Sequence, residues 1–400
     1  MTTKIKNILK MYDGTRKKGT IFIKKGEIVS KPTSDQKVTS VNGEGMVVFS
    51  GLIDLGTIIS DPGNEYRETL EQTCEAAYEG GFAALIAMPG EGTNADSKTY
   101  IEYLARRSGG VKGVKLYPLA PISERGAGDH LVEFIDLHHS GVIGFSDGMK
   151  PLQKSGVLMR AMEYVKAIDG IIITSPLDPD LFPQGQVNEG TISIQMGLPG
   201  IPEAAEEISV HRDISLAKLT NSRLHLYCIS TRGSIDLVRK AKKAGLQVTC
   251  SVSANNLLFT DTEVGGYNSE LKLLPPLRDS RTQKALWSAV VDGTIDIIVS
   301  QHTPLEPERK DLEFYYADFG TLGLQTVVGA LLQKYGVETA APVIQRAMHD
   351  RIKEVFNIES DTGQVIFGPM PIEFKREKVC SNCYNSPYLD HQINYSRINY

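Results

Sequence analysis

The sequence predicts an α/β protein, a (β/α)₈ TIM barrel with a small β-sandwich domain built from both chain termini. Three observations favour this fold. Eight short apolar runs follow one another between residues 51 and 300, segments with helical periodicity separate them, and both ends of the chain have strand-like patterns. Near-continuous apolar runs are typical of strands buried on both faces of a parallel sheet, and eight of them fit a closed barrel.

The expected small domain comprises residues 1–49 and 355–400. Its N-terminal part contains the segment Thr20–Val29, in which Gly26 marks a hairpin turn, and the apolar segment Met46–Phe49. In its C-terminal part, the segment GQVIFGPMPIEFKREKVCSNCYNSPY returns to β character. We therefore expect the two ends of the chain to fold together.

The expected (β/α)₈ barrel spans residues 50–354. Its strands are the eight apolar runs Gly51–Leu55, Ala83–Met88, Val114–Tyr117, Gly141–Phe145, Gly170–Thr174, Arg223–Ile229, Gln247–Val252 and Ile295–Ser300. The helices between them include Glu65–Gly80, Asp96–Arg107, Lys154–Ile168, Ser234–Ala244 and Ser280–Val291. A doubly wound open sheet is less favoured, because the segment after the first run lacks the G-x-G-x-x-G spacing of a phosphate loop.

Composition excludes several classes of protein. The formal net charge of −5 gives no basic footprint for nucleic acid. No apolar stretch approaches the length of a membrane span, and the N-terminus does not resemble a secretory leader, so we expect a cytoplasmic protein. The 5 cysteines are too few for a disulfide framework in 400 residues. Cys380 and Cys383 form a C-x-x-C without a second pair, which favours two unrelated cysteines over a zinc site.

Loops at the carboxyl ends of barrel strands form the functional site in this fold class. The residues after each expected strand are therefore the candidate site residues. In chain order they are Gly56, Ile58, Ser60, Gly90, Asp147, Ser175, Cys228, Asn255, Asn256, Gln301 and His302.

Several blocks of the sequence resemble the dihydroorotase family, and they extend over nearly the whole chain. They include GLIDLGTIISDPGNEYRET, NEGTISIQMGLPGIPEAAEE, LKLLPPLRD, DGTIDIIVSQHTP and SNCYNSPY. The resemblance implies a cyclic amidohydrolase barrel that uses zinc. It also implies that the family usually continues beyond SNCYNSPY through two further short strands, so that the small domain here is trimmed or is completed by another subunit.

The chain departs from the family pattern at nearly every functional position. The family block D-x-H-x-H-x-R supplies two zinc-binding histidines and a substrate-binding arginine, where this chain has Gly56, Ile58 and Ser60. At the other metal and catalytic positions, Ser175 and Cys228 replace two metal-binding histidines and Gln301 replaces the catalytic Asp. Gly90 replaces a substrate-binding Asn, and Asn255-Asn256 replaces a His-His pair. In two further motifs, Leu274 replaces the Asn of N-P-P-L-R and Gln325 replaces the Glu of G-L-E-T. Asp147 matches a metal-bridging aspartate of one branch, and Lys115 resembles a lysine that another branch carboxylates.

These replacements remove the donors that zinc chemistry needs. A hydrolytic zinc site requires three or four converging N, O or S donors, whereas Gly56 and Ile58 offer none and the Gln301 amide cannot accept a proton. Asp147, Cys228 and His302 remain as weak candidate ligands. We therefore expect no metal or other cofactor and assign no catalytic residue. His225 and Cys228 should face opposite sides of their strand, which argues against a Cys–His nucleophile pair.

The leading hypothesis is a catalytically inactive dihydroorotase-like protein of pyrimidine biosynthesis. By resemblance to homologues that lack metal ligands, it would have a structural or regulatory role alongside aspartate carbamoyltransferase, and we expect a homo-oligomer. One alternative is an active cyclic-amide hydrolase, of dihydroorotase, allantoinase or hydantoinase type, with a reduced metal site around Asp147, Cys228 and His302. Another alternative is a barrel that binds a small molecule without converting it.

Overall fold

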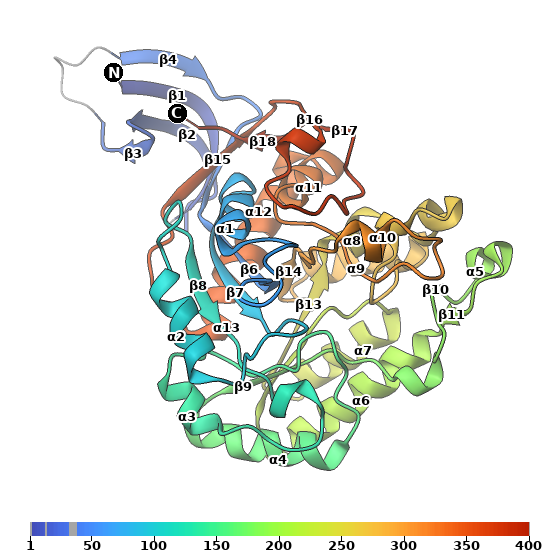
Figure 1. The fold of residues 1–400 in the computed structure, drawn as a ribbon. Coiled ribbons are helices and arrows are strands. Elements are labelled where there is room, and N and C mark those ends of the chain that lie inside the picture. Colours follow the sequence, from blue (N-terminus) through green and yellow to red (C-terminus); the bar gives the residue numbers. More distant parts are fainter. Residues whose placement is uncertain (1, 13, 32–37, 400) are drawn as a thin grey trace.

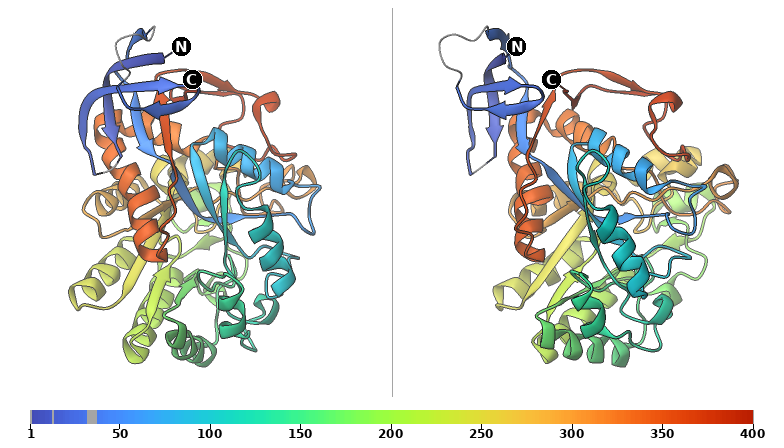
Figure 2. Two further views of the ribbon diagram at one scale, coloured as in Figure 1. Left: turned by 90° about the vertical axis from the view of Figure 1, so that its left-hand side faces the viewer. Right: turned by 60° about the vertical axis from the view of Figure 1, so that its left-hand side comes forward.

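Both ends of the chain contribute strands to one sheet, which projects from a larger α/β body (Figures 1 and 2). The computed structural model describes residues 2–12, 14–31 and 38–399. The parts of the expected small domain at residues 1, 13, 32–37 and 400 lie outside the described residues. None of the helices in the described part of the chain combines the length and the apolar character of a membrane span.

The projecting sheet has the strand order β18-β15-β5-β1-β2-β3, and β4 pairs with β1. Its strands are β1 (Thr2–Met11), β2 (Lys17–Lys24), β3 (Glu27–Val29), β4 (Val38–Asn42), β5 (Val47–Ser50), β15 (Gln364–Gly368) and β18 (Ser396–Arg397). Strand β15 runs antiparallel to β5, with Val365 opposite Phe49. This pairing joins the C-terminal segment to the N-terminal strands.

The α/β body is built on parallel strands. They are β6 (Leu52–Ile58), β7 (Phe82–Met88), β8 (Lys115–Pro118), β9 (Ile171–Thr174), β12 (Arg223–Leu226), β13 (Val248–Ser253) and β14 (Ile297–Val299). They form two parallel sheets in the orders β6-β7-β8 and β14-β13-β12-β9. The amide of Ile58, at the end of β6, donates a hydrogen bond of 3.1 Å to the carbonyl of His302 beyond β14.

The expected fourth strand, Gly141–Phe145, is reduced in the structure to single bridges made by Phe145. Phe145 pairs with Ala120 on one side and with Ile172 of β9 on the other, and so connects the two sheets. The segment starts from a left-handed glycine, Gly141 (φ 106°), and a Cβ at Gly144 would lie 3.0 Å from Ile171. Backbone hydrogen bonds nevertheless hold the segment between its neighbours, because the Phe145 amide donates 3.1 Å to the Ile171 carbonyl and the Ala120 amide donates 3.2 Å to the Gly144 carbonyl.

Helices surround the parallel strands (Figure 2). They are α1 (Leu70–Glu79), α2 (Lys98–Arg107), α3 (Phe134–His139), α4 (Ser155–Val165), α6 (Glu203–Thr220), α7 (Arg232–Lys243), α8 (Ala254–Leu258), α9 (Ser280–Val291), α10 (Pro307–Lys310), α11 (Val327–Tyr335), α12 (Val337–Gln345) and α13 (Arg351–Phe356). A small excursion between β9 and α6 contains β10 (Val187–Asn188), α5 (Thr191–Met196) and β11 (Gly200–Ile201). Helix α1 begins later than the sequence predicts, because Thr69 and Gln72 form a capping box that fixes its start.

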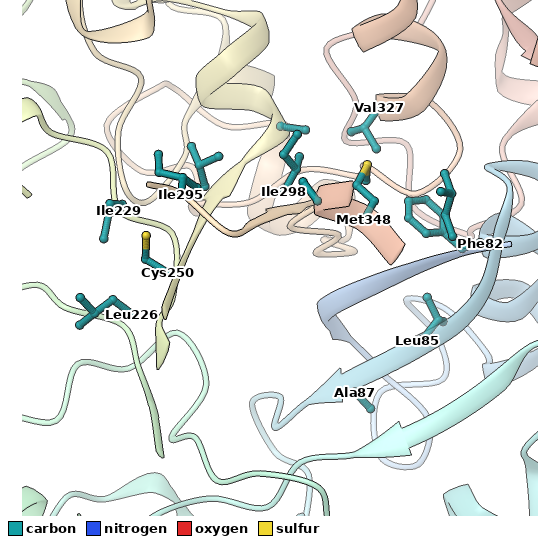
Figure 3. Packing of buried hydrophobic residues seen from close by; sticks show 14 of the residues in the cluster. Phe82, Leu85, Ala87, Leu226, Ile229, Cys250, Ile295, Ile298, Val327 and Met348 are labelled. Atoms are coloured by element: carbon teal, nitrogen blue, oxygen red, sulfur yellow. The ribbon is translucent and has the colours of Figure 1, made fainter. Parts of the chain in front are cut away.

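Alternate side chains of the strands pack into two separate clusters. Leu85 and Ala87 of β7, Leu226 of β12 and Ile298 of β14 face the surrounding helices (Figure 3). Their neighbours, such as Ile86 and Val299, face inward and pack with α13, where Val355 and Phe356 belong to the same cluster. This alternation buries both faces of the strands, as their near-continuous apolar sequences require.

The last fifty residues serve both parts of the molecule. Phe356 and Ile358, which the sequence assigns to the small domain, pack in the inner cluster of the body. Ser381 and Cys383 bond to the carbonyl of Arg67, so this part of the tail also lies against the body. Two short strands follow SNCYNSPY in the structure: β17 (His391–Ile393) pairs with β16 (Ile372–Phe374), and β18 pairs with β15.

Replacing Ile298 with alanine should destabilise the fold by about 2–5 kcal/mol, because a fully buried side chain leaves a cavity in the outer cluster. Urea unfolding followed by the fluorescence of Trp287, the only tryptophan, measures the change. The matched control is Ile194→Ala on α5, where the side chain is 80% exposed and the cost should stay within about 0.5 kcal/mol. Equal costs for the two variants would contradict this view of the core.

Candidate functional site

The end of β6 carries the first candidate position, Gly56, and the ring of Tyr227 fills the space beside it. Gly56 has a left-handed backbone (φ 91°), and a Cβ placed on it would lie 2.4 Å from the Tyr227 hydroxyl oxygen. That hydroxyl donates a hydrogen bond of 3.4 Å to the Gly56 carbonyl. Tyr227 is fully buried. A histidine at position 56 would therefore require Tyr227 to move.

The next positions of this segment are also without metal-binding groups. Ile58 packs against Gly90, since a Cβ at Gly90 would lie 3.2 Å from the Ile58 Cγ2 atom. Ser60 is buried, and its carbonyl accepts a hydrogen bond of 2.7 Å from the amide of Asn64. The three positions thus contribute packing and a loop contact, and no imidazole or carboxylate.

Asp147 has both carboxylate oxygens occupied by the loop after β8. One oxygen accepts hydrogen bonds from the amides of Ile122 (2.8 Å) and Ser123 (2.9 Å), and the other accepts one from the Ser123 hydroxyl (2.8 Å). Burial raises the pKa of Asp147 above its ordinary value, and these hydrogen bonds oppose that rise. Ser175 is likewise engaged, because its hydroxyl donates 2.8 Å to the carbonyl of Gly148.

Cys228 follows β12 in a left-handed conformation (φ 58°). Its amide donates a hydrogen bond of 3.0 Å to the Ser251 hydroxyl. Burial raises the pKa of the Cys228 thiol well above its ordinary value. Nucleophilic attack requires the thiolate, so a buried thiol with a raised pKa is not suited to that role.

His302 belongs to a buried pair with Glu68, a residue that precedes α1. The His302 Nε2 atom lies 3.1 Å and 3.2 Å from the two Glu68 oxygens, while Nδ1 accepts hydrogen bonds from the amides of Gly323 (3.2 Å) and Leu324 (3.4 Å). Because Nδ1 accepts these bonds, the ring proton resides on Nε2 and is donated to Glu68. Neither nitrogen of His302 is left for a metal.

Buried amide side chains stand where β13 and β14 end. Asn256 donates 2.9 Å to the carbonyl of Pro276, and Gln301 donates 2.6 Å to the carbonyl of Leu274. Among the described residues, the Asn256 Oδ1, Gln301 Oε1 and Asn255 Nδ2 atoms have no hydrogen-bond partner. These neutral groups can bind water or a small polar ligand, but they supply no negative charge to a divalent cation.

The side chains at the carboxyl-terminal edge of the parallel strands do not provide a set of donors that fits a zinc ion. Across residues 2–12, 14–31 and 38–399, no three His, Cys, Asp or Glu side chains converge in a way that could hold a metal. The weak candidates Asp147, Cys228 and His302 lie on this edge, but each has its donor atoms engaged or neutral. The cavity between Cys228, Ser175 and Leu274 has a volume of about 20 Å³, which is room for about one water molecule.

A larger cavity of about 320 Å³ opens at the same edge, beside Ile58 and Gly90. Four cations and four acidic side chains line it: Arg67, Arg125, Lys150, Arg309, Glu91, Asp96, Asp147 and Asp318. Arg309 pairs with both Glu91 and Asp318. Since the charges balance, this cavity has no evident preference for an anion or a cation.

Other residues singled out in the sequence lie elsewhere or serve the fold. Lys115 starts β8, at the opposite edge, and donates 3.1 Å to the carbonyl of Asp361. Gln325 donates to the carbonyl of Lys378 and accepts from the amide of Cys380, which ties down the tail. Burial raises the pKa values of Cys380 and Cys383 to about 12, so both are neutral thiols.

The alternation argument for His225 and Cys228 is wrong, because β12 ends at Leu226 before Cys228 is reached. Cys228 belongs to the inner cluster, and the ring of His225 lies 6.3 Å from Phe356 of that same cluster. His225 bonds to Thr249, whereas Cys228 borders Ser175 and Leu274. The two residues are thus separated along the strand direction rather than across it.

Sequence reasoning missed the residues that fill this edge. Tyr227, Glu68 and the buried pair Glu206–Arg278 were not singled out. Glu206 accepts hydrogen bonds from the amides of Ser230 (2.8 Å) and Thr231 (2.9 Å), and Arg278 lies 3.8 Å from it. No local pattern marks them, because Glu68 and Glu206 stand among other charged residues in the sequence and the partners of these residues are distant along the chain.

Known proteins share both the sequence pattern and the fold. A sequence model of the family described as dihydro-orotase-like matches residues 45–234. A dihydroorotase of Syntrophus aciditrophicus (strain SB) is 37% identical over 321 residues, which are 80% of this chain and 75% of that protein. A dihydroorotase of Geobacter metallireducens is 33% identical over 378 residues, covering 92% of this chain and 88% of that protein.

Solved structures show the same fold at low sequence identity. An L-hydantoinase (dihydropyrimidinase) from Arthrobacter aurescens has a TM-score of 0.80 at 19% identity, covering 99% of this chain and 93% of that chain. A D-hydantoinase (dihydropyrimidinase) from Thermus sp. has a TM-score of 0.73 at 19% identity, with the same coverage of both chains.

Replacing His302 with alanine should lower the free energy of unfolding by about 2–4 kcal/mol, because the buried Glu68 carboxylate loses a hydrogen-bond donor. Urea unfolding at neutral pH measures this loss. His211→Ala is the matched control, since His211 is exposed on α6 and should cost within about 0.5 kcal/mol. A His302 variant as stable as the His211 variant would show that His302 is not a structural residue.

Proposed function

The chain belongs to the dihydroorotase family, and from that premise we propose a dihydroorotase-like protein of pyrimidine biosynthesis that lacks zinc-dependent ring opening. One observation carries the proposal. Position 56, where the family pattern places the first zinc-binding histidine, is a glycine, and the Tyr227 ring occupies the space beside it.

The chemistry of the remaining groups supports this proposal. Ring opening by zinc needs a bound water of lowered pKa and a base that accepts its proton. Gln301, at the position of that base, is a neutral amide whose nitrogen is bonded to the carbonyl of Leu274. His302 is engaged with Glu68 on one side and with backbone amides on the other. Neither Gln301 nor His302 therefore offers a free basic lone pair for the proton of a zinc-bound water.

We also propose that the parallel strands close into a (β/α)₈ barrel, with residues 1–49 and 355–400 supplying the β-sandwich domain. The bridges of Phe145 join the two parallel sheets on one side. On the other side, the amide of Ser300 donates 2.7 Å to Asp54, and the amide of Ile58 donates to His302. These contacts link the first strand to the last, as closure requires.

The partner that we propose is aspartate carbamoyltransferase, by resemblance to family members without metal ligands, and we propose self-association as well. Exposed apolar side chains support a role in assembly. Tyr164 on α4 and Ile208 and Leu219 on α6 are 62%, 54% and 71% exposed, and these two helices pack against each other. Apolar surface of this kind on adjacent elements is typical of protein interfaces.

The purified protein, incubated with excess zinc and then desalted, should contain far less than one zinc per chain and should not hydrolyse dihydroorotate. Elemental analysis and a hydrolysis assay on one sample measure both properties. Cys228→Ala and Asp147→Ala should leave the zinc content unchanged, because neither side chain is a ligand. Near-stoichiometric zinc that is lost in the Cys228 variant, together with turnover, would favour an active enzyme with a reduced site.

Mixed with the aspartate carbamoyltransferase of its own organism, the protein should elute earlier from a size-exclusion column than either protein alone. Light scattering on the eluate gives the mass of the complex and, for the protein alone, its oligomeric state. An unrelated protein of similar mass is the control for non-specific association. Separate elution at physiological concentrations would count against the proposed partner while leaving the loss of zinc chemistry intact.

A further inference from the structure

A second cavity lies at the opposite edge of the parallel strands, where the strands begin. Its volume is about 450 Å³. Ile171, Arg223 and Val248, which line it, are the first residues of β9, β12 and β13, and Asp296 directly precedes β14. The cavity is therefore separated by the length of the strands from Gly56, Cys228 and the other candidate positions.

The side chains that line this cavity are predominantly cationic. Arg223, Lys242, Arg346 and Arg351 stand against only two acidic groups, Asp296 and Glu354, which leaves an excess of two positive charges. The cavity beside Gly90, by contrast, has equal numbers of cations and acids. An excess of one sign in a concave, partly buried space favours ligands of the other sign.

Two of the cations share one buried carboxylate. Asp296 accepts hydrogen bonds from Lys242 (2.6 Å) and Arg351 (2.8 Å) and also from the amide of Cys250 (2.9 Å). Arg351 makes a second contact with Glu354, which is largely exposed. One buried acid and one exposed acid thus neutralise this pair of cations.

The other two cations are held by neutral backbone groups. Arg346, in the π-helical turn Arg346–Asp350, donates to the carbonyls of Val290 and Val291 at the end of α9. Arg223 donates to the carbonyls of Asp169 (2.8 Å) and Val355. Carbonyl oxygens orient a guanidinium without cancelling its charge, and neither Arg223 nor Arg346 forms an ion pair with an acidic side chain of the cavity lining.

Repulsion between these cations is visible at Arg346. Burial lowers its pKa, and the nearby guanidinium groups of Arg16 and Arg351 lower it further, against the opposing effect of Asp296 and Asp292. An anion placed between the guanidinium groups would relieve this repulsion. The fold thus holds hydrogen-bond donors in fixed positions in a cavity whose lining has more positive than negative charges.

We propose that this cavity is a binding site for a small polyanion of the phosphate or pyrophosphate class. Guanidinium groups match the geometry of phosphoryl oxygens and donate two parallel hydrogen bonds. A ligand with two or more negative charges would neutralise the excess in the lining. The volume is within the range of small-molecule sites. The inference depends on neither the proposed loss of zinc chemistry nor the proposed partner.

Isothermal titration of the full chain with inorganic pyrophosphate, at constant ionic strength, tests the site. We expect saturable binding to one site, with inorganic phosphate weaker and succinate weaker still. Arg346→Gln and Arg351→Gln should each weaken pyrophosphate binding by roughly tenfold, as expected for one lost charge-assisted contact. The matched control is Lys150→Gln beside the other cavity, which should bind pyrophosphate as the parent protein does.

Arg346 and Arg351 also have structural contacts, so their variants must first show the far-ultraviolet spectrum and melting temperature of folded protein. Arg16→Gln is a second variant free of this difficulty, because Arg16 is exposed and its guanidinium acts on the site only through its charge. It should weaken binding by a few-fold and reduce its salt dependence. Absence of saturable binding, equal loss in the Lys150 variant, or preference for succinate would each overturn the proposal.

Discussion

The carboxylate of Asp54 fixes the first parallel strand to the last, and the geometry of the candidate site depends on it. It is completely buried and accepts hydrogen bonds from the Ser300 amide (2.7 Å), the Ser300 hydroxyl (2.7 Å) and the Thr57 hydroxyl. Burial raises the pKa of Asp54, and these three donors oppose that rise by stabilising its charged form. Residues 54 and 300 lie at opposite ends of the body in sequence, so Asp54, together with the hydrogen bond from the Ile58 amide to the His302 carbonyl, holds the loop that starts at Gly56 beside the loop that starts at Gln301.

Asp147 and His302, which lie where the parallel strands end, have their oxygens and nitrogens hydrogen-bonded within the protein, and no metal-binding geometry occurs among the described residues. A metal site needs lone pairs that converge on an empty point, whereas Asp147 directs its oxygens at the loop after β8 and His302 directs its nitrogens at Glu68 and two amides. Such internal pairing stabilises loops that an active enzyme would keep poised for a ligand. The replacements in the sequence and the contacts in the structure thus agree, because the polar groups of Asp147 and His302 hold loops of the fold.

Much of the fold could be predicted from the sequence, but only part of the site. Strand β7, strand β9 and helix α9 match their expected ranges closely, since burial on both faces or on one helical face leaves a clear period in the sequence. The weak strand at Phe145 and the return of Cys383 to the body could not be predicted, because both depend on close packing between distant segments. At the site, the absence of a metal-binding side chain at position 56 can be predicted directly from the sequence, because it depends only on the identity of Gly56. The filling of its space by Tyr227 is a property of the tertiary structure, and no local pattern records it.

The two edges of the body differ because their cations are held in different ways. Beside Gly90, Arg309 forms ion pairs with two carboxylates, so its charge is neutralised within the protein. At the other edge, Arg223 and Arg346 are oriented by backbone carbonyls, and their charge remains available. The same strands connect both edges: Asp296 directly precedes β14 and Gln301 follows it, and a strand residue spans only about 3.3 Å. The cations of the second cavity and the candidate positions Gln301 and His302 are therefore held by the same rigid elements, at opposite ends of the parallel strands.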